Sequence, residues 1–276
     1  MNEILDKGGR SIERLASRFL EAFDTHSWTA DREPQPSTLS IKEAYRVQDV
    51  VTRLRCLRGE QVVGFKVGCT SQAIRTQLGL REPIYGRLFD RYLYPDGAVF
   101  DGSAFVNCAI EPEMVILTGR DLQGEKLSDE QLIDGIASVR PGIELHHFKF
   151  WFSPTTSQEL ICSGGIHAGL VIGSSMVSPK ECRFADEIFS VFLNGRQITK
   201  APASEIMGGP LESMRWLITH LTRQGKFLKE NSLIIPGSPV ELVQIERDAE
   251  LTIRVAGVGS VHATFEGIPL KSERPM

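Results

Sequence analysis

The sequence lacks the features that would place it in a membrane or on nucleic acid. No stretch approaches the roughly 20 consecutive apolar residues that a transmembrane helix needs, and residues 1–10 lack the apolar core of a secretory signal. Positive charge is not in excess either, because 31 Lys and Arg stand against 35 Asp and Glu. Such a chain has no broad basic field to attract phosphate backbones or anionic lipid. We therefore expect a cytoplasmic protein that binds neither nucleic acid nor membrane.

Cysteine is also scarce, and its placement excludes two classes of small stabilised domain. The five cysteines are odd in number and widely scattered, and none forms a Cys-x-x-Cys pair. This arrangement fits reduced, mostly buried thiols better than a disulfide framework or a zinc knot. The 276 residues, 41% of them hydrophobic, are instead enough for a packed core in one large domain or two modest ones.

Segments with apolar residues at helical spacing are predicted to form helices. The first runs from Ser11 to Phe23, where a serine cap precedes an apolar stripe. Ser40, with Glu43 three residues later, makes a capping box that begins a second helix toward Leu54. Further helices are expected at residues 71–78, 128–139 and 210–223.

Alternating and β-branched segments predict strands, which dominate after residue 104. A first strand is expected at residues 62–68, and Asn194-Gly195 marks the tight turn of a hairpin. The remaining strands are expected at residues 104–117, 142–147, 168–173, 187–199, 232–236 and 250–266. This order predicts an α+β fold, with a small N-terminal α/β domain at residues 1–98 and a larger mixed-β catalytic domain with outer helices at residues 99–276.

The segment Glu111-Pro112-Glu113 is the most informative for chemistry. Residues two apart in a strand point the same way, so both carboxylates would project from one face. Pro112 would occupy a position where the sheet needs no backbone donor. Two carboxylates so close need a counter-charge, and a hard cation such as Mg²⁺ or Mn²⁺, which prefers oxygen ligands, would supply it.

Glu144 is a third candidate ligand, because it stands alone between Ile143 and Leu145 in a short strand pattern. A buried, unpaired carboxylate is costly, whereas a metal ligand is compensated. The spacing is equally compatible with three glutamates that face solvent on the outer side of a sheet. Spacing alone therefore leaves both interpretations open.

Lys66 is the candidate for proton transfer. It lies between Phe65 and Val67 and is bracketed by Gly64 and Gly68. A lysine in a partly dry site near a cation has its ammonium form disfavoured, which makes proton transfer near neutral pH feasible. The alternative is an exposed position on an edge strand.

Five short segments, taken in order, carry a family resemblance. They are Gly64-Phe65-Lys66-Val67-Gly68-Cys69-Thr70-Ser71, Pro83-Ile84-Tyr85-Gly86, Ile110-Glu111-Pro112-Glu113, Ile143-Glu144 and Met207-Gly208-Gly209-Pro210-Leu211. Together they resemble the fumarylacetoacetate hydrolase superfamily, and more narrowly its hydratase and decarboxylase branch, over about residues 40–265. No single segment is specific, but five with compatible spacing favour the metal interpretation of the glutamates.

The resemblance implies a compact mixed β-roll of the fumarylacetoacetate hydrolase type, with Mg²⁺ or Mn²⁺ held by Glu111, Glu113 and Glu144. It implies small 2-oxo acids as substrates, proton transfer or substrate contact by Lys66, and a homo-oligomer. Segments 83–86 and 235–238 match parts near the substrate, so Ile84, Tyr85 and Ser238 are candidate substrate contacts.

The chain also departs from the family pattern. Hydratases of this kind commonly carry an Asp where this chain has Ile84, between Pro83 and Tyr85. After the third ligand they often continue with an acidic residue, a Ser and an Arg, in place of the Leu145-His146-His147-Phe148-Lys149 found here. A stretch with Asn, Ala and paired Ser is replaced by Ser163-Gly164-Gly165-Ile166-His167. These changes alter the expected lining of the substrate pocket.

Three histidines, His146, His147 and His167, lie near these motifs. Imidazole titrates near neutral pH, so either member of the adjacent pair could carry a proton. We take His147 as the catalytic candidate. The alternative is a polar outer position on the strand.

These features together predict a metal-dependent lyase for a small 2-oxo acid or its enol, with a 2-hydroxy-dienoate hydratase as the first choice. A 2-oxo carboxylate can chelate the ion, which then stabilises charge on the keto oxygen during hydration, decarboxylation or carbon-carbon cleavage. A decarboxylase or carbon-carbon hydrolase of the same fold is the alternative. A non-catalytic partner subunit is a third interpretation, against which the retained Lys66 and the three glutamates argue.

Overall fold

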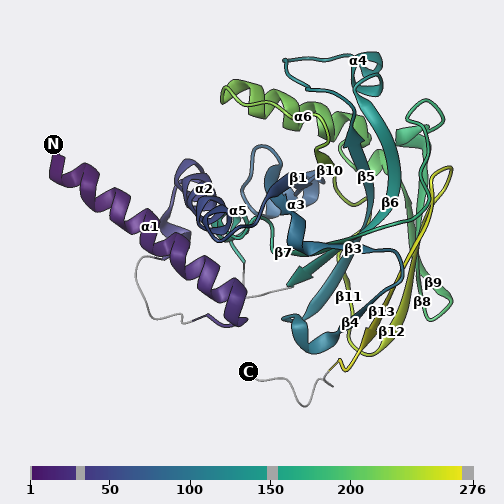
Figure 1. Cartoon of the computed structure of the whole chain (residues 1–276), viewed down its shortest axis with the longest axis horizontal. Helices are drawn as coiled ribbons and strands as arrows, with labels where there is room; N and C mark the ends of the chain where they lie inside the picture. The colour runs from purple at the N-terminus through teal and green to yellow at the C-terminus, as the bar shows by residue number, and fades with distance from the viewer. Residues whose placement is uncertain (1, 29–34, 148–154, 269–276) are drawn as a thin grey trace.

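The computed structural model describes residues 2–28, 35–147 and 155–268, and within these ranges two β-sheets carry the core (Figure 1). The larger sheet contains β1 (Val62–Gly68), β2 (Ile84–Phe89), β3 (Leu93–Pro95), β5 (Cys108–Thr118), β6 (Ile136–His147), β7 (His167–Ile172), β10 (Leu233–Ile235) and β11 (Val243–Gln244). Its strands follow the order β2-β1-β10-β5-β6-β7-β3, and β11 pairs with β5. The long central pair β5–β6 therefore has neighbours on both sides.

The smaller sheet packs against one face of the larger one. It contains β4 (Ala98–Asp101), β8 (Ile188–Leu193), β9 (Arg196–Pro202), β12 (Ala249–Val255) and β13 (Gly259–Glu266), in the order β4-β13-β12-β8-β9. One large cluster of buried apolar side chains joins the two sheets, with Ile110, Ile143, Phe189 and Ile253 among its members. Curled sheets joined by such a core, with helices outside, confirm the predicted α+β class.

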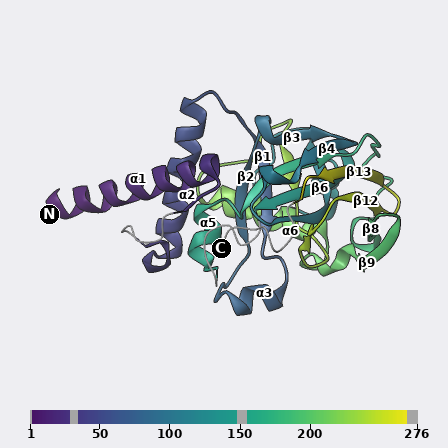
Figure 2. The same ribbon diagram turned by 90° about the horizontal axis from the view of Figure 1, so that it is seen from below.

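Helices flank the two sheets, and one of them adds apolar side chains to the core cluster that joins the sheets. They are α1 (Asn2–Thr25), α2 (Ile41–Leu57), α3 (Gln72–Gln77), α4 (Asp129–Ile133), α5 (Ser157–Cys162) and α6 (Pro210–Arg223). Helices α1, α2 and α5 form a group beside β2, and the N-terminal end of α1 projects away from the sheets in both views (Figures 1 and 2). None of the helices that the structure describes is long and apolar enough to cross a membrane.

Several local predictions are confirmed and one is wrong. The capping box at Ser40 begins α2, and the hairpin β8–β9 turns at Asn194-Gly195, where both residues have positive φ. The helix expected at residues 128–139 ends at Ile133, and β6 begins at Ile136. Pairing of that segment with β5 outweighs its local helical pattern. Strands β2, β3 and β4 and helix α5 were not predicted.

The predicted domain boundary near residue 98 falls at the start of β4, and strands from before and after it pair within the larger sheet. β1 pairs in parallel with β10, and β3 pairs in parallel with β7. Strands from the N-terminal segment thus complete the larger sheet on both sides of β5 and β6. This arrangement brings Lys66 of β1 to the same sheet as the glutamates of β5 and β6.

The alternation of side chains along β5 separates the hydrophobic core from the candidate site. Ile110, Met114 and Ile116 face the smaller sheet and belong to its core cluster. Residues at the odd positions, Glu111 and Glu113, point to the opposite face. That second face carries only a small apolar cluster, formed by Leu88, Val115, Leu170 and Ile235. The two faces of one strand therefore serve different purposes.

Candidate metal centre

The register of β5 against β6 places two glutamates side by side. Glu111 lies directly opposite Glu144, and Glu113 lies opposite Gly142. Directly opposed residues in an antiparallel pair have Cβ atoms about 5 Å apart and point to the same face. His146 follows Glu144 by two residues in β6, so its side chain extends to that face as well.

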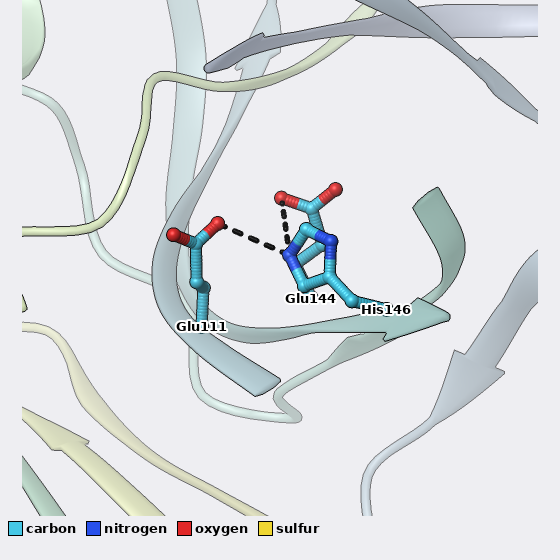
Figure 3. Close-up of side chains that lie close together, drawn as sticks. All are labelled: Glu111, Glu144 and His146. Atoms are coloured by element: carbon cyan, nitrogen blue, oxygen red, sulfur yellow. Dashed lines mark hydrogen bonds and ion pairs between the residues drawn. The ribbon is translucent and has the colours of Figure 1, made fainter. Parts of the chain in front are cut away.

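Glu111, Glu144 and His146 converge on one point (Figure 3). Each offers a ligand atom, and these three atoms all lie within 4.8 Å of one another. His146 Nε2 is 3.1 Å from Glu111 Oε2 and 3.5 Å from Glu144 Oε2. The side chain of Glu144 is fully buried, whereas that of Glu111 is 23% exposed, so the group can be approached from the Glu111 side.

Lys66 reaches the same group from β1. Its Nζ is 2.5 Å from Glu144 Oε1 and donates a hydrogen bond of 3.3 Å to the carbonyl of Gly165. Glycines make room for its stem: a Cβ on Gly86 would lie 3.1 Å from Lys66 Cγ and only 2.3 Å from the Gly164 carbonyl oxygen. Lys66 is therefore buried and paired, and does not lie on an exposed edge.

The close packing of these charges shifts their pKa values in opposite directions. Burial raises the pKa of the Glu144 carboxyl, but the neighbouring Lys66 and His146 outweigh it and hold that pKa well below its usual value. Burial, followed by the charges of Glu144 and Glu111, raises the pKa of Glu113 well above its usual value. Negative charge on this face thus exceeds what Lys66 alone neutralises.

Lys66 itself has a raised pKa. Burial lowers it, yet the charges of Glu144 and Glu111 more than compensate, so the ammonium form is favoured. This direction is opposite to the one expected from the sequence, because the carboxylates lie closer to the amine than the lysine's apolar neighbours suggested. Lys66 therefore holds a proton that it can donate.

The donor set fits a divalent cation. Glu144 Oε2 and Glu113 Oε1 are buried and have no hydrogen-bond partner among the described residues. The other oxygen of Glu113 accepts a hydrogen bond of 3.1 Å from the backbone N–H of Gly237. Buried carboxylate oxygens without donors are costly unless a cation compensates them. Glu113 shares the face of the other two glutamates but lies outside the tight group that they form with His146.

His167 supports Glu144 from the side opposite to His146. Its Nδ1 is 2.8 Å from Glu144 Oε1, while its buried Nε2 has no hydrogen-bond partner among the described residues. The same histidine lines a cleft between α2, β2 and the residues after α5, together with Thr52, Arg55, Arg87 and Ser163. His167 thus separates that cleft from the carboxylates.

His147, our catalytic candidate from the sequence, points away from the carboxylates. It lies one residue beyond His146 on β6 and therefore faces the opposite side of the sheet. Its Nδ1 accepts a hydrogen bond of 3.2 Å from the Val106 backbone N–H, and its ring packs against Phe23 and Phe105. Burial lowers the pKa of His147 to about 3, so the ring is neutral near pH 7. These contacts are those of a structural residue.

The three candidate substrate contacts differ in placement. Ile84 shares the face of Lys66, and both side chains lie within 4 Å of the position that a Cβ on Gly68 would take. Tyr85 is on the other face, stacked on Tyr45. The hydroxyl of Ser238 donates to the carbonyl of Val240, within its own loop. Among the three, Ile84 is the one that the structure brings beside Lys66.

Sequence reasoning underrated His146 and His167. The rule that paired Glu111 with Glu113, two positions apart in a strand, also pairs Glu144 with His146. Applied to β6, it would have selected His146 over His147. No comparable signal marked His167, because its approach to Glu144 depends on the pairing of β6 with β7.

Comparisons with known proteins find relatives that are similar in sequence and in fold. No family model matches the chain. The 2-keto-4-pentenoate hydratase of Paraburkholderia xenovorans (strain LB400) is 28% identical over 233 residues, covering 83% of this chain and 85% of the hydratase. The structure of 4-oxalocrotonate decarboxylase from Pseudomonas putida G7, complexed with magnesium and adipate, has a TM-score of 0.85 and 26% identity over 93% of this chain and 97% of that one.

A more distant structure shares the fold alone. Fumarylpyruvate hydrolase from Pseudomonas aeruginosa, in complex with Mn²⁺ and pyruvate, has a TM-score of 0.58 at 16% identity, covering 73% of this chain and 88% of the hydrolase. The hydratase and the decarboxylase named above confirm the resemblance to the hydratase and decarboxylase branch that the sequence motifs indicated.

The placement of His147 leads to a stability prediction. Replacing it with Phe keeps the ring packing but leaves the part-buried Val106 N–H without its acceptor, which should cost about 1 kcal/mol in the free energy of unfolding at pH 7.5. The folded pKa of about 3 lies below the unfolded value of 6.5, so wild-type stability should fall as the pH drops below 6.5. The variant has no imidazole at this position and does not lose this stability. The difference in unfolding free energy between the wild type and the variant should therefore be smaller at pH 5 than at pH 7.5. Denaturant titration at both pH values measures it.

His262→Phe is the control, since that histidine side chain is 56% exposed. An unchanged unfolding free energy in His147→Phe, combined with lost turnover, would instead restore His147 to the catalytic role predicted from the sequence.

Proposed function

We propose that this chain, which resembles the hydratase and decarboxylase branch of the fumarylacetoacetate hydrolase superfamily in sequence and fold, is a metal-dependent lyase acting on a small 2-oxo acid or its enol. Its reaction is the addition of water to a 2-hydroxy-dienoate. The observation that carries the proposal is the buried group of Glu111, Glu144 and His146 beside Lys66, with carboxylate oxygens that lack hydrogen-bond donors.

Glu111, Glu113 and Glu144 would hold Mg²⁺ or Mn²⁺. Two of them face each other across β5–β6, and the third is the next residue along the same face. Oxygen donors of this kind suit both ions. The chemistry that a cation supplies here is the stabilisation of negative charge on the keto oxygen of a 2-oxo acid. Because Glu111 is the partly exposed member of the group, substrate would approach from its side.

Lys66 would move the proton. Hydration of an enol requires a proton on carbon and the oxygen of water on a neighbouring carbon. The carboxylates keep Lys66 in its ammonium form, so the proton is in place, and a cation on the same carboxylates would lower the pKa of the amine and ease the transfer. Glu144 and the carbonyl of Gly165 hold its Nζ in place, and the neighbouring glycines let its stem pass without a clash. A positioned donor needs no reorganisation when the substrate arrives.

Decarboxylation is the second candidate, and Ile84 is the residue that favours it. Ile84 lies beside Lys66, where hydratases of this branch commonly carry an Asp. An apolar side chain there cannot orient water, whereas loss of CO₂ depends mainly on charge stabilisation at the keto oxygen. The retained lysine and carboxylates serve both reactions, so product analysis must separate them.

Incubation with candidate substrates tests the proposed reaction directly. The purified protein with Mg²⁺ or Mn²⁺ is offered 2-hydroxy-dienoates, 4-oxalocrotonate and acylpyruvates, and the products are identified by NMR. We expect water addition to a 2-hydroxy-dienoate without release of CO₂. Release of CO₂ assigns the chain to decarboxylation, and cleavage of an acylpyruvate assigns it to carbon-carbon hydrolysis. A metal-loaded protein that leaves the whole panel unchanged would contradict the lyase proposal and favour a partner subunit.

Location and assembly complete the proposal. We propose a cytoplasmic location from the composition of the chain, and the family resemblance favours a homo-oligomer. Exposed apolar residues of the smaller sheet, Val99, Ile188 and Ile198, offer surface that a second copy could cover.

Glu113→Gln tests the carboxylate set. The amide oxygen can still accept from the Gly237 N–H, but the charge is lost. We expect calorimetry to show no Mg²⁺ binding, and turnover to disappear with it. Glu250→Gln, at an exposed position of β12, is the matched control and should bind like the wild type. If Mg²⁺ binding survives in each of the single Gln variants of Glu111, Glu113 and Glu144, the ion binds elsewhere.

Lys66→Met tests the proton donor. Methionine keeps most of the stem but removes the amine, so turnover should fall about a hundredfold or more, as is usual for loss of a general acid or base. Divalent-ion binding measured by calorimetry should remain, because Lys66 contributes no ligand atom. Lys200→Met, at an exposed position of β9, is the control. Wild-type turnover in Lys66→Met would remove this residue from the mechanism.

A further inference from the structure

We propose that His146 Nε2 is itself a ligand of the ion, so that the centre is a mixed nitrogen and oxygen site that favours a first-row transition dication over Mg²⁺. This inference rests on the proposed metal centre and specifies its donors. The tight donor group in the structure is Glu111, Glu144 and His146, so one imidazole joins the carboxylates.

The distances within this group suit a shared cation. Adjacent ligands of an octahedral ion with bonds of about 2.1 Å lie about 3 Å apart. His146 Nε2 is 3.1 Å from Glu111 Oε2 and 3.5 Å from Glu144 Oε2, so it has this relation to both carboxylates. The second distance is too long for a good hydrogen bond, and Glu144 Oε2 has no hydrogen-bond partner. A cation between the three atoms would satisfy that oxygen.

The burial of His146 also indicates a ligand. Its side chain is 2% exposed, and its polar contacts within the described residues are Nε2 to the two carboxylates. Without a cation, Nε2 donates a hydrogen bond to Glu111 Oε2, and a ligating Nε2 would place the ring proton on Nδ1, which is buried without a hydrogen-bond partner there. A histidine that served only to hydrogen-bond Glu111 would not also need to lie beside Glu144.

The nitrogen donor changes which ion the site prefers. Mg²⁺ demands oxygen ligands and gives up its water reluctantly, whereas imidazole suits transition metals. Mn²⁺ accepts carboxylate oxygen and imidazole nitrogen alike, and it is paramagnetic. Mn²⁺ is therefore the probe with which the proposed ligand can be detected.

The experiment combines pulsed electron paramagnetic resonance with calorimetry on the Mn²⁺-loaded, full-length protein. Electron spin echo modulation reports ¹⁴N bonded to Mn²⁺, independently of turnover. We expect imidazole modulation in the wild type and its loss in His146→Gln. Loss of a residue that merely hydrogen-bonds a metal ligand typically lowers metal affinity about tenfold or more. Loss of a ligand itself should therefore lower the Mn²⁺ affinity of the variant at least about tenfold. The Mg²⁺ affinity should change less than the Mn²⁺ affinity.

Two further variants serve as controls. His167→Gln removes the other imidazole near Glu144, and His262→Gln removes an exposed one. Loss of the ¹⁴N signal in His167→Gln but not in His146→Gln would assign the nitrogen to His167 and overturn the proposal. Mn²⁺ bound without ¹⁴N modulation would also overturn it, while leaving the carboxylate centre intact. Absence of Mn²⁺ and Mg²⁺ binding in the wild type would instead refute the metal centre on which it rests.

Discussion

The site depends on the direct opposition of Glu111 and Glu144 across β5 and β6. Two carboxylates at such a pairing position repel each other, and burial of Glu144 removes the water that would screen the repulsion. The remaining charged groups of the face reduce this cost. Lys66 contacts one oxygen of Glu144, His167 contacts the same oxygen, and His146 lies between the two glutamates. The divalent cation that we propose would supply further positive charge to this face.

The fold isolates this electrostatic arrangement from the hydrophobic core. Even-numbered residues of β5, such as Met114, pack against the smaller sheet, while Glu111 and Glu113 face away from it. Substitutions at the site should therefore affect chemistry more than folding. The opposite holds for His147, whose ring lies among aromatic side chains on the core face. One residue of displacement along β6 decides between the two roles.

Local signals in the sequence predicted the elements that depend on local chemistry. The capping box of Ser40 with Glu43 placed the start of α2, and Asn194-Gly195 placed a hairpin. Segments whose structure depends on long-range strand pairing were harder to predict from the sequence. The helix predicted at residues 128–139 gives way to β6 at Ile136, and β2 was missed because it is buried on both faces and shows no alternation. Propensity does not report which strand a segment will pair with.

The candidate site shows the same division. The motifs named Glu111, Glu113, Glu144 and Lys66, and the structure places all four on one face of the larger sheet. The contribution of His146 and His167 required the register of β5, β6 and β7, which no spacing in the sequence fixes.

His146 lies in the segment that departs from the family pattern after the third ligand, and His167 ends the second segment that departs from it. Two imidazoles therefore lie beside Glu144 in this chain. That difference bears on which ion and which 2-oxo acid the site accepts.

A crystal structure of the protein soaked with Mn²⁺ and oxalate, a mimic of an enolised 2-oxo acid, tests the central claim most directly. The account predicts an anomalous scattering peak on the face shared by Glu111 and Glu144, with oxalate bound to the ion and Lys66 beside the oxalate. A structure in which Mn²⁺ binds away from these two glutamates would contradict the account. So would a structure in which Glu111, Glu144 and His146 keep their direct contacts and no ion is bound.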